Sequence, residues 1–172
     1  MIDNPMAVRC MLLPLSSINL LIPNSTVAEI VGYSSPSPLA GSSAWFPGVV
    51  LWRGVYVPVV RVEEMCAIET APVSTRSRFA ILYNPSKDDD LPYLGIHIQD
   101  IPRAYLAEVE NMESGSDDGL SQYLLSRVDE DHLSRFLPNL DKIVADLKLE
   151  YSLDQLDQLS SKPTNGLNIT PG

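Results

Sequence analysis

The sequence predicts a mainly β protein, with an all-β sandwich or barrel followed by a single helix. Between residues 8 and 137, apolar runs of about four to eight residues alternate with clusters of Pro, Gly, Ser and Asp, which is typical of sandwiches and barrels and not of βαβ proteins. Only residues 139–149 carry a long helical pattern. The chain has 172 residues, of which 45% are hydrophobic, so it can bury a core as one domain or as two closely packed half-domains.

Each apolar run is bounded by turn-forming residues, where strands usually end. Strands are expected over residues 10–15, 19–23, 29–33, 49–52, 55–62, 79–83, 93–98, 105–109, 123–128 and 132–137. The Ser16–Ser17 pair makes the first two a hairpin, and residues 34–43 are expected to form a loop. Asn24 or Ser25 is expected to cap one helical turn over residues 26–28.

The strand over residues 55–62 is expected to be buried on both faces, because both are apolar. One face carries Val55, Val57 and Val59, and the other carries Tyr56, Val60 and Val62. Pro58 cannot donate a ladder hydrogen bond, so it indicates an edge, a bulge or a crossover at that point.

The helix is expected from Asn139 to about Leu149. Its apolar residues recur at the i, i+3, i+4 and i+7 spacing of one helix face: Leu140, Ile143, Val144 and Leu147. Asn139 suits the N-cap, and Asp141 and Lys148 carry charges that suit the two ends of the helix dipole.

Composition excludes several classes of partner. The formal net charge is −10, from 12 basic and 22 acidic residues, which argues against nucleic acid or an anionic membrane surface. The apolar stretch of residues 11–22 is interrupted and too short to span a membrane. Cys10 and Cys66 are not at metal-ligand spacing, so two buried thiols in a reducing compartment are expected, with one disulfide as the open alternative. We expect a cytoplasmic protein without direct membrane insertion.

The sequence lacks the residue constellations of common catalytic sites, so we expect no enzyme activity, no metal and no cofactor. The two histidines, His97 and His132, have no second ligand at metal spacing. His97 and Asp100 would be a conceivable base and orienter, but their odd separation on one strand points them to opposite faces, and His97 is expected to be an ordinary surface histidine. Residues 88–90 and 116–118 are expected to be solvated turns and not calcium loops.

Residues 44–60 are the most informative segment, since Arg53 and Gly54 form a tight turn between two apolar strands. An unpaired buried charge costs several kcal/mol, so Arg53 requires an acid partner. The nearest good candidate upstream is Glu29. We expect a buried Glu29–Arg53 ion pair that fixes strand register, with a cost of about 3–5 kcal/mol for removing one partner.

Three large aromatics, Trp45, Phe46 and Trp52, lie close together in the same segment. They can serve as core packing or as a partner-facing apolar patch, since aromatic residues beside arginine are typical binding anchors. Both interpretations stay open.

Residues 48–58 have the pattern Gly-x-x-x-x-Arg-Gly-x-x-x-Pro and follow Val-x-Glu-Ile-x-Gly-Tyr at residues 27–33. This arrangement resembles the CheW-like adaptor family of bacterial chemosensory arrays. Residues 94–101 are similar to that family's Val-Gly-Ile-Val-Val-Asp-x-Val strand. Residues 137–143 resemble its closing strand and final helix, so the resemblance covers residues 10–148.

The resemblance implies two packed SH3-like five-stranded β-barrels with a C-terminal helix. Residues 1–9 would then be an N-terminal arm, residues 10–150 the CheW-like domain and residues 151–172 a mobile tail. It implies a non-enzymatic adaptor that couples the cytoplasmic tip of a methyl-accepting chemoreceptor to the regulatory domain of a CheA-like histidine kinase. The candidate partner-binding residues are Val27, Glu29, Gly48, Trp52, Arg53 and Gly54.

One departure from the family pattern stands out, because Arg61 replaces the acid of the usual Pro-Val-Ile-Asp-Leu. Together with the bulky residues 45–47, it resembles the divergent adaptors of type IV pilus and twitching-motility systems. The alternative function is a small-ligand or second-messenger-binding β-barrel regulator. Such a regulator would need clustered arginines for an anionic ligand, and Arg76 and Arg78 are the only close pair in the sequence.

Overall fold

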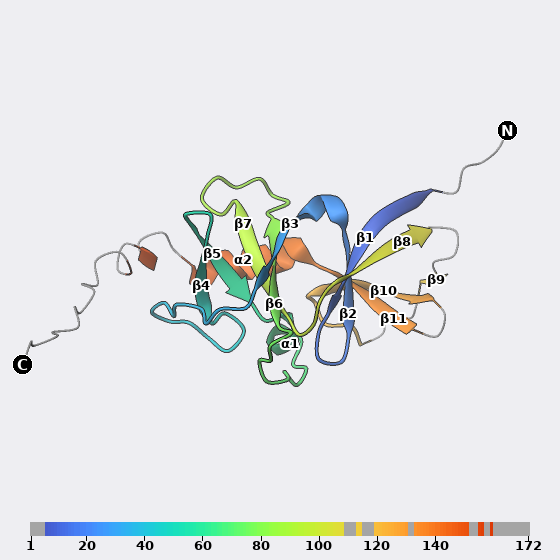
Figure 1. Cartoon of the computed structure of the whole chain (residues 1–172), viewed down its shortest axis with the longest axis horizontal. Helices are drawn as coiled ribbons and strands as arrows, with labels where there is room; N and C mark the ends of the chain where they lie inside the picture. The colour runs from blue at the N-terminus through green and yellow to red at the C-terminus, as the bar shows by residue number, and fades with distance from the viewer. Residues whose placement is uncertain are drawn as a thin grey trace, which may run out of the picture.

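The computed structural model describes residues 6–108, 113–114, 119–130, 133–151, 155–156 and 159. In this part of the chain the strands form a six-stranded and a five-stranded sheet, which lie on the right and left of Figure 1. The predictions for His132, for residues 116–118 and for most of the tail at 151–172 concern positions outside the described residues. The prediction of a mainly β protein is confirmed.

The first sheet has the order β8-β1-β2-β11-β10-β9. Its strands are β1 (Ala7–Pro14), β2 (Asn19–Pro23), β8 (Arg103–Glu108), β9 (Glu113–Ser114), β10 (Leu124–Glu130) and β11 (Leu133–Pro138). The predicted hairpin of β1 and β2 is confirmed, with Leu12 opposite Leu21 in an antiparallel ladder. β2 and β11 run parallel, so the sheet is mixed.

The second sheet has the order β3-β6-β7-β5-β4. Its strands are β3 (Val27–Gly32), β4 (Gly48–Trp52), β5 (Val55–Val60), β6 (Arg78–Tyr83) and β7 (Tyr93–Ile98). β3 and β4 are therefore the two edges of this sheet. The parallel ladder between β5 and β7 contains only Val59 and Val60 on the β5 side, so Pro58 lies where β5 has no hydrogen-bonded neighbour on that side, as its chemistry requires.

Apolar side chains fill three clusters, one shared by both sheets and one belonging to each sheet. The shared cluster includes Leu13, Leu20, Val60, Leu82 and Ile96. The cluster of the second sheet consists of Val50, Val57, Val59, Phe79 and Ile81, and that of the first sheet of Cys10, Leu21 and Ala107. β5 contributes to two clusters, which confirms that both of its faces are buried.

Helix α2 (Leu140–Glu150) runs behind the second sheet in Figure 1 and packs Ile143, Val144 and Leu147 into the shared cluster. The Asn139 side chain accepts a hydrogen bond from the backbone N–H of Lys142 at 3.2 Å. Both the apolar stripe and the N-cap predicted for this helix are therefore confirmed.

Two local predictions are wrong. The expected helical turn is a 3-10 turn at Asn24–Thr26, preceded by Pro23 and without a side-chain cap, so neither Asn24 nor Ser25 acts as the predicted cap. Strand β5 ends at Val60, and the next residues form the short helix α1 (Val62–Met65), which the apolar alternation through Val62 concealed.

Helix α1 carries a buried carboxylate, Glu63, whose exposure is 0%. It accepts a hydrogen bond from the backbone N–H of Ser16, in the β1–β2 turn, and another from the Gln99 side chain at 3.4 Å. Glu63 thus links the turn of the first sheet to the end of β7.

Both cysteines are free thiols: Cys10 is buried and Cys66 is half-buried. Burial raises the pKa of both thiols above the ordinary value. Among the described residues, no helix is both long enough and apolar enough to cross a lipid bilayer.

Candidate partner-binding site

The β4–β5 hairpin turns through Arg53 and Gly54, which have φ values of 48° and 78°. Two consecutive positive φ values characterise the type I′ turn, whose twist matches that of the flanking strands. Gly54 adopts this conformation without steric cost. The tightness of the turn projects the Arg53 side chain outward, where 69% of it is exposed.

Glu29 of β3 faces this turn and contacts two of its side chains. One carboxylate oxygen, Oε2, lies 3.2 Å from Nη2 of Arg53 and accepts a hydrogen bond from Nε1 of Trp52 at 2.7 Å. The Arg53 guanidinium also lies 5.1 Å from the centre of the Trp52 ring. The predicted Glu29–Arg53 pair is therefore confirmed.

The prediction that this pair is buried is wrong. The Glu29 side chain is 39% exposed and the Arg53 side chain 69%, because both residues lie at edges of the second sheet and the turn stands away from the core. Ion pairs as exposed as this one contribute only about 0–1 kcal/mol to stability. The expected cost of 3–5 kcal/mol for breaking it no longer applies.

A β-bulge aims Glu29 at the hairpin. In the β3–β6 ladder Val27 lies opposite Leu82 and Glu29 opposite Ile81, so Ala28 is an extra residue. A bulge reorients the side chains that follow it. Ala28 packs against the second-sheet cluster, and so does Trp52, which Glu29 bonds. The bulge therefore directs the side chains of Ala28 and Glu29 toward the same face of the sheet.

Aromatic rings continue from Trp52 across the sheet. Trp52 meets Tyr93 edge-on at 4.9 Å between ring centres, and Tyr93 lies 5.7 Å from Tyr83. Trp52 is half-buried against the second-sheet cluster, whereas Tyr83 is 49% exposed. Trp52 is thus a packed residue that remains partly accessible, which combines the two interpretations that the sequence left open.

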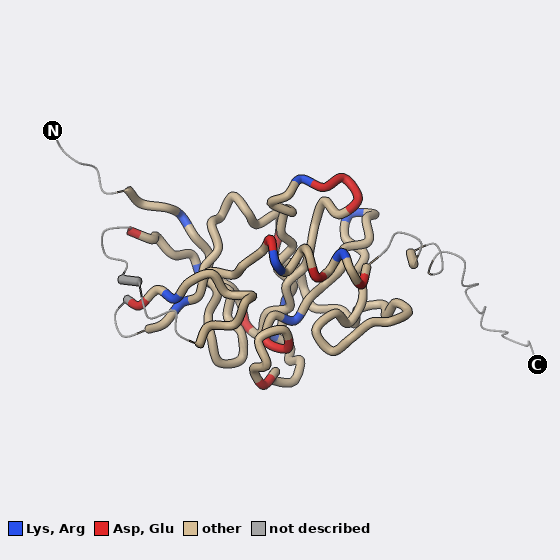
Figure 2. Tube along the Cα trace, turned by 180° about the vertical axis from the view of Figure 1, so that it is seen from behind, with Lys and Arg blue, Asp and Glu red and all other residues tan. Residues whose placement is uncertain are grey.

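We call the residues Glu29, Trp52, Arg53, Val55, Tyr83 and Tyr93 the hairpin surface. Val55 belongs to it because it is 41% exposed and lies directly opposite Trp52 in the hairpin. A pocket of about 440 Å³ adjoins the surface at Tyr83 and Tyr93 and extends to Lys87 and Asp88. Figure 2 shows the acidic stretch of the β6–β7 loop, which flanks this pocket, at the top of the second-sheet lobe.

The other predicted site residues lie deeper. Val27 is half-buried against the shared cluster. Gly48 is buried with φ 138°, and a Cβ there would lie 2.0 Å from the backbone oxygen of Ser37. Residue 37 forms a bridge with Val49, so the preceding loop passes close to β4 at this point. The absence of a side chain at Gly48 makes room for that loop, and Gly48 therefore shapes the site through the backbone. Phe46 is a core residue at 1% exposure, and Trp45 is half-buried beside it.

The prediction that His97 lies on the surface is wrong, since the residue is only 2% exposed. Its strand, β7, has neighbours on both faces, and the imidazole packs 5.2 Å from the ring of Tyr33 and 5.8 Å from that of Phe79. Neither ring nitrogen has a hydrogen-bond partner among the described residues. Burial, followed by the nearby positive charge of Arg61, lowers the pKa of His97 to about 4.

The strand alternation predicted that Asp100 does not orient His97, and the structure agrees, since neither nitrogen of His97 bonds Asp100. The Asp100 carboxylate instead pairs with Arg76, whose Nη2 lies 2.6 Å from Oδ1. Asp88, in the acidic stretch of residues 88–90, accepts a hydrogen bond from Lys148. Within the described ranges no group of three His, Cys, Asp or Glu residues is placed to hold a metal ion.

Sequence reasoning missed Tyr83 and Tyr93. They lie directly opposite each other in the β6–β7 ladder, at the ends of two strands that were predicted as neighbours along the chain. Aromatic residues that flank one hairpin loop are a usable signal, because directly opposed side chains in an antiparallel pair contact each other.

A comparison with protein-family models matches residues 9–147 to the CheW-like domain. A search of curated protein sequences finds no match. Among solved structures, the fold is similar to the crystal structure of the scaffolding protein TtCheW from Thermoanaerobacter tengcongensis, with a TM-score of 0.68 and 15% sequence identity. The match covers 81% of this chain and 89% of that one.

The fold is that of a protein with two packed SH3-like β domains and a C-terminal helix. The family model spans most of the chain, from β1 into α2. The chain belongs to the CheW-like domain family.

Proposed function

We propose that this chain is a chemosensory adaptor, which acts by binding and performs no chemistry of its own. Its partners are the cytoplasmic tip of a methyl-accepting chemoreceptor and the regulatory domain of a CheA-like histidine kinase. Membership of the CheW-like family supports the role of scaffold. The observation that carries the proposal is the hairpin surface, with Trp52 held by Glu29 and flanked by Arg53.

Trp52 and Arg53 are suited to be binding anchors. Tryptophan, tyrosine and arginine dominate the residues that carry most of the energy of protein interfaces. The hydrogen bond to Glu29 and the edge contact with Tyr93 restrict the Trp52 ring before any partner arrives. An anchor that is already ordered loses less conformational entropy on binding.

We assign the receptor tip to the hairpin surface. The aromatic rings offer an apolar strip, and the neighbouring charges of Arg53 and Glu29 offer polar contacts at its border. Such a strip suits the apolar face of a helix, which presents its anchors at i, i+3 and i+4. The kinase domain, which has the same fold in the family, meets the adaptor barrel against barrel.

Calorimetric titration of the full chain with a receptor-tip fragment and with the kinase regulatory domain tests this assignment. We expect micromolar binding of both. Arg53→Ala should weaken receptor binding at least about tenfold and leave kinase binding within about twofold of the parent. Arg127→Ala is the control, because Arg127 forms a partly exposed pair with Asp129 on the first sheet. The adaptor role requires both partners, so it would be overturned if the folded chain failed to bind one of them.

We further propose that the system served by this adaptor drives type IV pilus-dependent twitching. The support is the departure at Arg61 and at residues 45–47 from the usual family pattern. Deletion of the gene should abolish twitching on a surface and leave swimming intact. Lost swimming with normal twitching would contradict this part of the proposal alone.

A further inference from the structure

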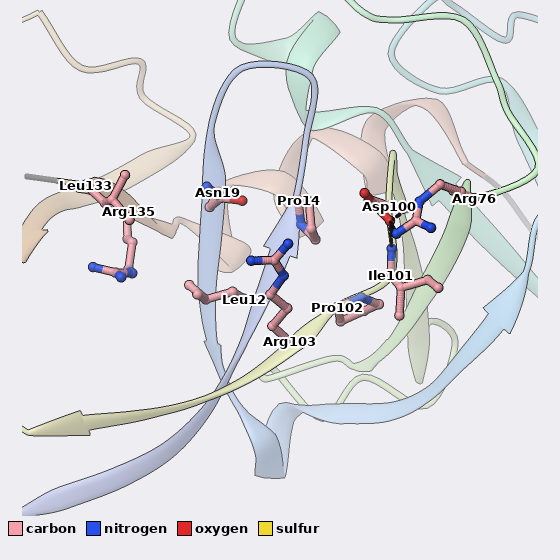
Figure 3. A pocket seen from close by; sticks show the side chains of 10 residues that line it. All are labelled: Leu12, Pro14, Asn19, Arg76, Asp100, Ile101, Pro102, Arg103, Leu133 and Arg135. Atoms are coloured by element: carbon pink, nitrogen blue, oxygen red, sulfur yellow. Dashed lines mark hydrogen bonds and ion pairs between the residues drawn. The ribbon is translucent and has the colours of Figure 1, made fainter. Parts of the chain in front are cut away.

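A second pocket, of about 470 Å³, adjoins one face of the first sheet, reaches the segments before β6 and after β7, and shares no residue with the hairpin surface. Arginines from three distant segments line it: Arg76, Arg103 and Arg135. In Figure 3, Arg103 stands between Arg135 on one side and the pair of Arg76 and Asp100 on the other. The sequence indicated only Arg76 and Arg78 as a close pair, so this grouping is a product of the fold.

Strand register explains why Arg103 and Arg135 share one face of the first sheet. Arg103 of β8 lies opposite Leu12 of β1, and Pro14 of β1 lies opposite Asn19 of β2. Since Leu12 and Pro14 are two residues apart, they share one face of the sheet. Asn19 in turn lies opposite Arg135 across the parallel β2–β11 ladder, so both arginines are on that same face.

The pocket is locally positive within an acidic protein. Asp100 is the only acid among its lining residues, against three arginines, whereas the whole chain has a formal net charge of −10. The Asp100 carboxylate is engaged by Arg76 at 2.6 Å and by the backbone N–H of Ile101 at 2.6 Å. The hydrogen bond from Arg76 holds the pKa of Asp100 below its usual range, so this acid stays ionised and orients Arg76.

The other two arginines are arranged differently. Arg135 is only 8% exposed, and its guanidinium lies 4.6 Å from the centre of the Tyr105 ring. Arg103 is exposed, and its positive charge helps to lower the pKa of Asp100, but no hydrogen bond or ion pair joins its guanidinium to another residue in the described part of the chain. An exposed arginine at the edge of such a pocket can bind phosphate, because guanidinium groups bind phosphate oxygens in a bidentate manner.

The rest of the lining favours an organic ligand over a bare ion. Leu12, Ile101, Pro102 and Leu133 supply apolar surface, and Asn19 supplies an amide that both donates and accepts hydrogen bonds. Small-molecule sites have volumes of about 300–1,000 Å³ and combine apolar walls with a few polar groups. The overall negative charge of the chain disfavours a long polyanion.

We propose that this pocket binds a small organic phosphate, with the phosphate at Arg103 and the organic part on the apolar wall. The site does not depend on the proposed adaptor role, since it shares no residue with the hairpin surface. A chain with both sites would carry a scaffold surface and a separate ligand-responsive site.

Calorimetric titration of the full chain with AMP, cyclic di-guanylate and pyrophosphate tests the proposal, with adenosine as the uncharged control. We expect at least one of the two nucleotides to bind with a Kd below about 1 mM, more tightly than pyrophosphate, and adenosine not to bind. Arg103→Gln should weaken nucleotide binding at least about tenfold. Arg127→Gln, a change on the same sheet outside the pocket, should leave it unaltered.

Several results would overturn the proposal. These are no saturable binding of either nucleotide, binding that Arg103→Gln leaves unchanged in a folded variant, or pyrophosphate binding as tightly as the nucleotides. Capture of an Asp- and Glu-rich peptide in the absence of nucleotide binding would identify the pocket as a protein contact and would overturn it too. Because Arg103 is exposed, circular dichroism should show an unchanged melting temperature for Arg103→Gln, and receptor binding should also be unchanged.

Discussion

The carboxylate of Glu29 accepts the indole N–H of Trp52 at 2.7 Å and thereby joins the two edge strands of the second sheet. β3 and β4 are separated by three strands within the sheet, so this contact exists only because the sheet curls into a barrel. The same oxygen of Glu29 pairs with Arg53. One side chain therefore both closes the barrel and positions the residues that we assign to partner binding.

Substitution of Trp52 separates its two roles. Trp52→Phe keeps an aromatic ring against the second-sheet cluster but removes the N–H donor, so we expect a loss of about 1 kcal/mol in the free energy of unfolding. Trp52→Ala also removes the packed ring and should cost about 3 kcal/mol or more. Urea unfolding measures both. Equal effects of the two variants would show that the ring contributes nothing to the core.

The Glu29–Arg53 pair should contribute little to stability although it contributes to binding. In a double-mutant cycle with Glu29→Gln and Arg53→Ala, we expect a coupling energy below about 1 kcal/mol in thermal or urea unfolding, because the pair is exposed. A coupling of about 3 kcal/mol or more would restore the original prediction of a buried pair.

Gly48 should be irreplaceable for steric reasons. In Gly48→Ala the new methyl group would lie 2.0 Å from the Ser37 backbone oxygen, and the backbone φ of 138° is unfavourable for any other residue. We expect a loss of at least about 3 kcal/mol or failure to fold. Gly32→Ala is the control, since a Cβ there meets nothing within 4 Å. Equal stability of the two variants would contradict the close approach.

Buried His97 should make the protein sensitive to mild acid. Its folded-state pKa of about 4 lies below the ordinary value of 6.5, so the unfolded chain binds the proton first as the pH falls. Stability is therefore fully present above about pH 6.5 and falls by on the order of 2–3 kcal/mol toward pH 4. The paired acids Asp100 and Asp146, whose pKa values are lowered by Arg76 and Lys142, contribute their losses at lower pH.

Urea unfolding between pH 7 and pH 4.5 checks this dependence. His97→Phe removes the titrating group and keeps an aromatic ring beside Tyr33 and Phe79, so its stability should vary less over this range than that of the parent. An identical pH profile for parent and variant would show that His97 is not the cause.

Glu63 should matter more for stability than its neighbour on α1. Glu63→Ala leaves the backbone N–H of Ser16 without its acceptor, which should cost about 1–3 kcal/mol. Glu63→Gln retains an acceptor oxygen and should cost less. Glu64→Ala is the control, because Glu64 is exposed and its carboxylate bonds only Thr70 among the described residues. Melting temperatures that rank these three variants otherwise would contradict the role of Glu63.

Local chemistry was sufficient to predict much of the fold. Period-two apolar patterns and turn residues located the strands, and the 3.6-residue period with Asn139 located helix α2. The Arg53–Gly54 dipeptide indicated its turn, and charge balance indicated Glu29 as the partner of Arg53. These features depend on residues near one another along the chain or on a single obvious partner.

Contacts that depend on sheet curvature and on register between distant strands could not be predicted. The alternation around β7 showed that His97 faces away from Leu94 and Ile96, but it did not show that a second apolar cluster covers that face. The burial of Arg135 and its place on the same sheet face as Arg103 likewise require the β8-β1-β2-β11 order.

The sequence by itself determined which segments are strands and helix and which of their faces are apolar, because these properties follow from backbone geometry and side-chain polarity at short range. Only the tertiary structure decided that the Glu29–Arg53 pair is exposed, that Trp52 shares the Glu29 carboxylate and that three arginines line one pocket. Those outcomes depend on which strand edges meet when each sheet curls, and that is set by the packing of the whole chain around its shared core.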